Sequence, residues 1–136
     1  MSLSLSEYKS SCQEKQKIII SKEKASKHIA NNVDEDFVRQ FRIDGYVITE
    51  NIKKCDFLVL NDNKKDAYFI ELKGNDISGA IEQLSQTVKI LENDLIGYDK
   101  KLRIVFSGKV KSGTVLEWKI KHKNLKAERE KLEENI

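Results

Sequence analysis

The sequence contains no proline, only two cysteines and a single tryptophan. Its longest apolar runs are patches such as residues 57–60, far short of the about 20 apolar residues that a membrane-spanning helix needs, so a transmembrane role is excluded. Cys12 and Cys55 lack C-x-x-C spacing, which favours a reducing compartment over a disulfide-linked secreted fold. Residues 1–7 show neither a basic leader nor an apolar stretch, so we expect no secretory signal and a cytoplasmic protein.

The overall composition predicts one folded domain spanning residues 1–136, because 39% of the residues are apolar and the chain has the length of a single core. The net charge of +3 is unevenly distributed. Between Asp34 and Asp99, 14 residues are acidic and 8 basic, whereas between Lys100 and Lys126 nine are basic and only Glu117 is acidic. A basic segment of this kind can attract a polyanion such as a nucleic acid. A solvated outer face is the alternative interpretation.

The first half of the chain favours strands after a polar entry segment. The first thirty residues are rich in lysine and suit a helix or a partly frayed segment. Alternation between residues 37 and 49 indicates strands on both sides of an Asp44-Gly45 bend. Residues 57–60 and 67–72 are short apolar runs joined by a loop of Asn, Asp and Lys, which predicts a β-hairpin.

The second half begins with a helical pattern, because apolar residues from Ile77 to Leu95 recur at three- and four-residue steps. Asn75 or Asp76 can cap this helix, and Gly97 marks its end. Residues 102–106 and 115–120 are predicted as strands, and residues 125–134 as a short charged helix. The expected fold is α/β or α+β, in the order α-β-β-β-α-β(-β), with a central mixed sheet of four to five strands flanked by helices. Within it, residues 1–12 could be disordered and 122–136 would form a charged C-terminal helix.

Charged residues stand at the ends of the two hairpin strands. Asp56 opens the first strand, and Glu71 and Lys73 close the second, where alternation sends both side chains to one face. If the turn centres between residues 63 and 64, Leu58 faces Phe69 and Asp56 faces Glu71. Both strands are apolar on both faces, so a slip of one residue, which would send Asp56 to the other side, stays open.

A divalent cation would resolve the repulsion between two carboxylates placed this close together. Asp56 and Glu71 offer hard oxygen ligands, and no histidine or cysteine pattern suggests zinc. Such ligands favour Mg²⁺, with Mn²⁺ as a substitute, held by one or two carboxylates together with water and substrate phosphate.

These residues carry a resemblance to a known group of enzymes. Asp56, fourteen intervening residues, Glu71-Leu72-Lys73, Gly74 and an amphipathic helix resemble the motif of the PD-(D/E)XK nuclease superfamily, and the element order resembles its restriction endonuclease-like core. The similarity extends over residues 38–107 and includes five blocks: Arg42-Ile-Asp-Gly45, Cys55-Asp-Phe-Leu58, Tyr68-Phe-Ile-Glu-Leu-Lys-Gly74, Ala80-Ile-Glu-Gln-Leu84 and Arg103-Ile-Val-Phe-Ser107. In this sequence Cys55 replaces the proline that precedes the motif's aspartate.

The resemblance implies a metal-dependent nuclease that hydrolyses phosphodiester bonds in DNA. Asp56 and Glu71 would bind Mg²⁺, with the Leu72 carbonyl as a further ligand, and Lys73 would hold or polarise the attacking water. Gln83 resembles a recurrent glutamine that could orient water or substrate; the alternative is a solvent-facing helix residue.

Several further residues are candidates for the same site or for binding DNA. Many members of the superfamily use an acidic residue from the first helix, and four residues qualify: Glu23, Asp34, Glu35 and Asp36. Arg39 and Arg42 could bind phosphate, or form surface salt bridges with the acidic residues 34–36. Four lysines near the C-terminal end could contact the phosphate backbone without reading the base sequence: Lys109, Lys111, Lys119 and Lys121.

Other residues favour ordinary structural roles. His28 and His122 are predicted to lie on the surface, Cys55 to pack as a small apolar group, and Trp118 to point into the core from a strand. The chain leaves little room for a recognition domain, so we expect a homodimer or a partner protein to supply specificity. The competing hypotheses are a catalytically inactive nucleic-acid-binding or protein-interaction module on the same fold, and an interaction protein whose charged hairpin ends form surface salt bridges.

Overall fold

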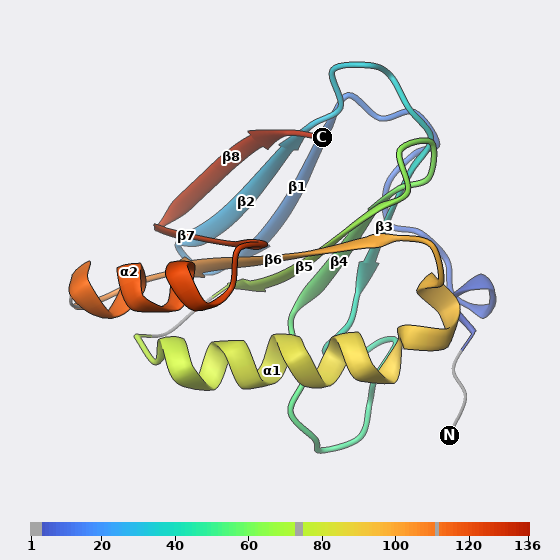
Figure 1. Ribbon diagram of the computed structural model, residues 1–136. Helices are drawn as coiled ribbons and strands as arrows, with labels where there is room; N and C mark the ends of the chain where they lie inside the picture. The colour runs from blue at the N-terminus through green and yellow to red at the C-terminus, as the bar shows by residue number, and fades with distance from the viewer. Residues whose placement is uncertain (1–3, 73–74, 111) are drawn as a thin grey trace.

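The computed structural model describes residues 4–72, 75–110 and 112–136, and Figure 1 shows their arrangement. They form an α+β fold with two α-helices, two short 3-10 helices and two β-sheets. The strands are β1 (Ile18–Glu23), β2 (Ser26–Asn31), β3 (Val38–Arg42), β4 (Phe57–Asn61), β5 (Asp66–Leu72), β6 (Asp99–Phe106), β7 (Leu125–Arg129) and β8 (Lys131–Asn135). The helices are η1 (Leu5–Glu7), α1 (Ile77–Ile90), η2 (Glu92–Leu95) and α2 (Ser112–Lys121). Within the described ranges, no helix has both the length and the apolar character required to cross a bilayer.

The predicted central mixed sheet is confirmed and has five strands in the order β3-β4-β5-β6-β7. The pairs β3–β4 and β4–β5 are antiparallel, whereas β5–β6 and β6–β7 are parallel. Helix α1 lies across one face of this sheet, and a second sheet covers the opposite face (Figure 1). Two apolar cores result: Leu58, Phe69 and Leu84 belong to the core on the α1 side, whereas Val59 and Ile70 belong to the core between the sheets.

The hairpin and the first long helix fold as their sequence patterns predict. Leu58 pairs with Phe69 in the β4–β5 ladder, the register expected from the polar loop. Helix α1 begins after Asp76, whose carboxylate accepts a hydrogen bond from the Gly79 N–H at 2.9 Å. This cap satisfies one of the backbone donors that are free in the first turn.

The expected N-terminal helix is wrong, because β1 and β2 form an antiparallel hairpin there. Strand β8 joins it in parallel beside β2 and completes a three-stranded sheet. On β1, Ile19 is buried whereas Ile18 and Ile20 are 53% and 51% exposed, so the apolar run does not reveal which face is inside. Leu5 is also buried, and its N–H bonds Asp94 at 3.0 Å, so disorder over 1–12 does not hold for residues 4–12.

Three further segments differ from the expected elements. Residues 115–120 belong to helix α2 and not to a strand, and Trp118 is half-buried on that helix. The charged C-terminal helix expected over 122–136 is replaced by strands β7 and β8. Residues 46–48 form a turn region in which Ile48 makes an isolated bridge to Asp44, so only one strand, β3, borders the bend. In the C-terminal segment, pairing with the distant strands β6 and β2 overrides the local pattern.

A buried charged cluster connects the two sheets. Glu134 on β8 accepts hydrogen bonds from His28 Nε2 at 2.7 Å and from Arg103 Nε at 2.7 Å and NH2 at 3.0 Å. The His28 side chain is fully buried, so its predicted surface position is wrong. Burial alone would raise the pKa of the Glu134 carboxyl, but the bonds from His28 and Arg103 outweigh this effect and hold the pKa at about 2.

Candidate functional site

The two predicted carboxylates lie where β4 begins and β5 ends. Asp56 is 2% exposed and Glu71 is 1% exposed. The β4–β5 ladder ends at the pair Phe57–Ile70. The next pair, Asp56 facing Glu71, is predicted from the sequence but does not belong to the ladder. The Asp56 N–H instead bonds the Ile70 carbonyl at 3.0 Å, and the Asp56 carboxylate accepts the Leu72 N–H at 2.8 Å. The Asp56 carboxylate therefore lies directly against the last peptide group of β5.

Strand alternation places Glu71 on the α1 side of the sheet. Ala67 and Phe69 pack in the core beneath α1, and Glu71 follows them at the same two-residue spacing. A slip of the hairpin by one residue is excluded by the observed Leu58–Phe69 pairing. The carboxyl end of β5 thus presents an acidic group toward the helix that follows it.

The start of β4 is fixed to α1 beside this acidic pair. Thr87 Oγ1 accepts the Cys55 N–H at 2.8 Å and donates to the Gln83 carbonyl at 2.8 Å. Burial raises the pKa of the Cys55 thiol; the Thr87 hydroxyl opposes this rise, and the negative charges of Glu71 and Asp56 add to it. Both carboxylates therefore lie close enough to influence the same buried thiol. Cys55 packs as a small buried group, as predicted.

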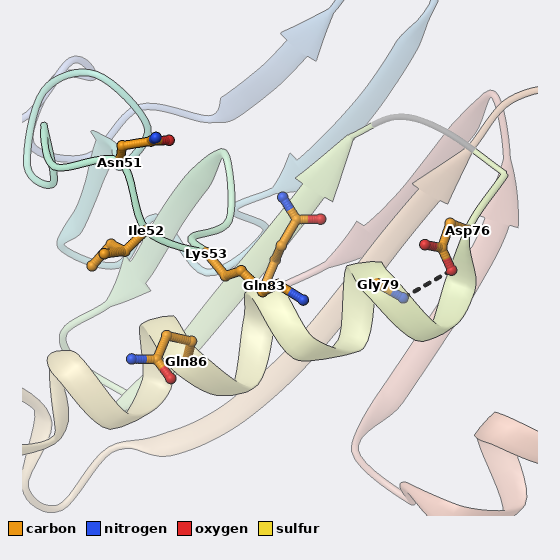
Figure 2. Close-up of a pocket in the computed structure, with 7 residues that line it drawn as sticks. All are labelled: Asn51, Ile52, Lys53, Asp76, Gly79, Gln83 and Gln86. Carbon is orange, nitrogen blue, oxygen red and sulfur yellow. Dashed lines mark hydrogen bonds between the residues drawn. The ribbon is translucent and has the colours of Figure 1, made fainter.

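Gln83 connects α1 to the loop that leads into Asp56. Its side-chain nitrogen donates to the Lys54 carbonyl at 3.2 Å, so the residue is held and is not simply solvent-facing. Figure 2 shows this side chain between helix α1 and residues 51–53. The predicted role in orienting water or substrate stays a prediction, but the residue that Gln83 contacts, Lys54, precedes Asp56 by two positions in the chain.

A groove of about 670 Å³ opens between this loop and α1. Figure 2 shows its lining side chains. They include the amides of Asn51, Gln83 and Gln86, the apolar Ile52 and the ammonium of Lys53. Sequence reasoning identified only Gln83 among them. The others are exposed residues of a loop and a helix surface, for which a single sequence gives no distinguishing pattern. Thr87, which lies beside the groove's wall, could have been noticed as a polar residue on the apolar face of α1.

The donor set of Asp56 and Glu71 suits Mg²⁺, which is commonly bound through one or two carboxylates with water completing its shell. Burying carboxylates is costly unless cations or hydrogen-bond donors face them, and both side chains are nearly fully buried. Among the described residues no group of three His, Cys, Asp or Glu side chains has the arrangement of a metal site. The two carboxylates would thus form a sparse site that depends on water and substrate oxygens.

None of the four candidate acidic residues lies on a first helix, because that region is the β1–β2 hairpin and its following loop. Glu23 accepts a hydrogen bond from Arg42, and Glu35 pairs with Lys17. The other two candidates are Asp34 and Asp36, whose carboxylates lie 2.7 and 3.6 Å from the Lys64 ammonium.

The two predicted arginines lie at opposite ends of β3. Arg39 binds Asp62 through Nε at 2.7 Å and NH2 at 2.9 Å, and Tyr98 donates to the same carboxylate. This pair lies near the β4–β5 loop, at the far end of β4 from Asp56. Arg42 is paired with Phe57 in the ladder and so lies at the same end as Asp56. The predicted salt bridges from these arginines to residues 34–36 are not present, because Arg39 pairs with Asp62 and Arg42 with Glu23.

The predicted lysines gather near α2. Lys121 lies over the Trp118 ring at 5.2 Å, and Lys119 belongs to the same helix. Lys109 is exposed in the loop before α2. Lys73, predicted to act on water, and Lys111, predicted to bind phosphate, lie outside the described residues.

Comparisons with protein-family models, with curated proteins and with solved structures each found no match to this chain.

Proposed function

We propose that this protein is a metal-dependent nuclease with a restriction endonuclease-like core that hydrolyses phosphodiester bonds in DNA. The observation that carries the proposal is that two buried carboxylates stand at neighbouring strand ends, Asp56 where β4 begins and Glu71 where β5 ends, with the Asp56 carboxylate bonded to the Leu72 N–H. The motif spacing identified in the sequence, with Lys73 two residues after Glu71, supports it further.

Asp56 and Glu71 would hold Mg²⁺ or Mn²⁺, with the Leu72 carbonyl as a further ligand. The bound cation would lower the pKa of water and offset charge that develops on the phosphoryl oxygens. Lys73 would donate a hydrogen bond to the attacking water, and the Gln83 amide would orient water or the phosphate. The hydrogen bond from the Leu72 N–H fixes one Asp56 oxygen and so orients the carboxylate.

Electrostatic attraction would bring the nucleic acid to this end of the sheet. Arg42 pairs with Phe57 at the start of β4, and its guanidinium bonds Glu23 on the face of the sheet opposite α1; its side chain is 48% exposed, so a phosphate would reach it only on that face. Lys109, Lys119 and Lys121 extend the basic surface along α2, while Arg39 is held by Asp62 and is the weakest of the proposed DNA contacts. Contacts of this kind bind the backbone without selecting sequence.

The test incubates the purified protein with plasmid and oligonucleotide DNA in Mg²⁺, Mn²⁺ or EDTA. We expect cutting in either metal and none in EDTA. Glu71→Gln and Asp56→Asn should each abolish cutting while retaining the fold, as checked by circular dichroism. Gln13→Ala, a change at an exposed amide, is the control that should cut normally. Cutting that survives EDTA or both carboxylate changes would contradict the proposal.

A non-catalytic module on the same fold is the second candidate. The sparse ligand set favours it, since no third metal-ligating side chain joins Asp56 and Glu71 among the described residues. Nucleic-acid binding without cutting in any metal would support this candidate over the first.

The proposed cellular setting follows the sequence prediction. Cys12 and Cys55 are free, which suits the reducing cytoplasm. A homodimer, or a partner protein that supplies specificity, stays part of the proposal, and sedimentation with and without DNA would test it.

A further inference from the structure

We propose that the groove between residues 51–54 and α1 holds an unpaired nucleobase, so that the substrate carries a single-stranded segment beside the bond to be cut. This inference rests on the proposed function and names the substrate class of the same site. The groove, of about 670 Å³, falls within the size range of small-ligand sites in proteins.

Chain connectivity places the groove next to the carboxylates. Residues 51–54 form one wall and lead directly into Cys55 and Asp56. This wall is held to α1 at two points: the Gln83 amide donates to the Lys54 carbonyl, and Thr87 accepts the Cys55 N–H. A ligand in the groove is therefore held at a fixed position relative to Asp56, with no intervening flexible segment.

The chemistry of the lining favours a neutral polar ring over a phosphate. Asn51, Gln83 and Gln86 each present an amide, which donates and accepts hydrogen bonds as the edge of a base requires. Ile52 is 42% exposed and offers an apolar surface on which a ring can pack. Among the described residues, Lys53 is the only cation of the lining, and its ammonium is already paired with the carboxylate of Glu82.

The position of the amides favours an unpaired base over a base stacked in a duplex. Amides read a paired base only when they project into a groove of the duplex, whereas here they line a hollow in the protein (Figure 2). A base can enter such a hollow only after it has left its stack, as in the recognition of single strands and flipped nucleotides. The carboxylate of Asp76 lies at one end of the lining, and its negative charge disfavours a phosphate in the groove.

The test measures binding by fluorescence anisotropy in the Glu71→Gln protein, so that no ligand is cut. The probes are a labelled single-stranded oligonucleotide, the same strand with an abasic site placed at each position in turn, and the matching duplex. Deoxyribose and ribose versions of the strand are compared, because an unpaired base could come from DNA or RNA. We expect one abasic position to weaken binding about tenfold and the duplex to bind more weakly than the single strand.

The decisive variant adds Asn51→Ala and Gln86→Ala, two exposed side chains outside the proposed catalytic group. It should bind the intact strand about tenfold more weakly and no longer distinguish it from the abasic strand. The matched control removes two exposed amides that do not line the groove, Gln13→Ala with Asn135→Ala, and should behave as the parent. Thermal melting establishes that both variants are folded.

The outcomes separate this inference from the proposed function. Metal-dependent cutting by the wild type, together with unchanged base discrimination in the groove variant, would overturn the groove assignment and leave the nuclease intact. Base discrimination lost in the groove variant without cutting by the wild type would support the groove and overturn the nuclease. Equal binding of intact and abasic strands by the parent would also overturn the groove assignment.

Discussion

Replacing Glu134 by glutamine tests the buried cluster that joins the two sheets. Glu134 accepts hydrogen bonds from His28 and Arg103, and the exposed fractions of the three side chains are 7%, 0% and 5% respectively. Glu134→Gln preserves the size of the side chain and removes its charge, which leaves the Arg103 guanidinium buried without a counter-ion. Removing one member of a buried pair costs about 3–5 kcal/mol of stability.

The pKa of Glu134 gives a second route to the same magnitude. The carboxyl has a pKa of about 2 in the folded protein against an ordinary value of 4.5. Each tenfold change in proton affinity corresponds to about 1.4 kcal/mol, so ionised Glu134 stabilises the fold by about 3 kcal/mol at neutral pH. Because the folded pKa is the lower one, this contribution is complete above about pH 5 and is lost as the pH falls toward 2.

Urea unfolding followed by circular dichroism at pH 7 and pH 3 measures both effects. We expect Glu134→Gln to lower the free energy of unfolding by about 3 kcal/mol at pH 7 and by less than half of that at about pH 3, where the wild type has itself lost stability. Glu133→Gln, at a neighbouring side chain that is 47% exposed, is the control and should change it by less than about 0.5 kcal/mol. A loss for Glu134→Gln that is equally small, or equal at both pH values, would refute the reasoning.

Three further predictions concern helix α1 and are checked by the same unfolding measurement. Leu84→Ala opens a cavity at a fully buried position and should cost about 2–5 kcal/mol, whereas the exposed neighbour change Ser85→Ala should cost less than about 0.5 kcal/mol. Thr87→Val leaves the buried Cys55 N–H without its acceptor and should cost about 1–3 kcal/mol, and Thr87→Ser should recover most of this loss. Asp76→Ala removes the helix cap and should cost about 1 kcal/mol, with Asp76→Ser close to wild type; equal losses for both would contradict the capping role.

The features predicted correctly from the sequence depend on local patterns. The hairpin register followed from a polar loop between two apolar runs, since the loop fixes which residues face each other. Helix α1 followed from apolar spacing that is borne out by the burial of Ile77, Ala80, Ile81 and Leu84. These two elements bring Asp56 and Glu71 to the same region, so the core of the candidate site was accessible to sequence reasoning.

The wrongly predicted elements depend on distant partners. Residues 125–134 are rich in Lys, Glu, Ala and Leu, which favour helices in isolation, yet they pair as strands with β6 and β2. In residues 115–120 the alternation of Leu116, Trp118 and Ile120 indicated a strand, but Leu116 and Ile120 are 59% and 71% exposed on a helix. For residues 125–134, no pattern within the segment could show which distant strand would be available.

The groove and the His28 cluster were missed for a related reason. His28 meets Glu134 across 106 positions of sequence, so its burial could not be inferred from the lysines around it. The groove combines a loop with a helix surface, and its amides acquire meaning only when both are placed in space.

The parallel pairing of β2 with β8 has a consequence for how the chain acquires its fold. Strand β8 is translated after the other seven strands of the described chain. The chain segment between β2 and β8 contains all five strands of the larger sheet, so their pairing closes a long loop. Closing so long a loop is slow, because chain entropy is lost before the new contacts form. During synthesis the β2 edge of the β1–β2 hairpin therefore stays unpaired until β8 is made, and an unpaired strand edge is exposed to association with neighbouring chains.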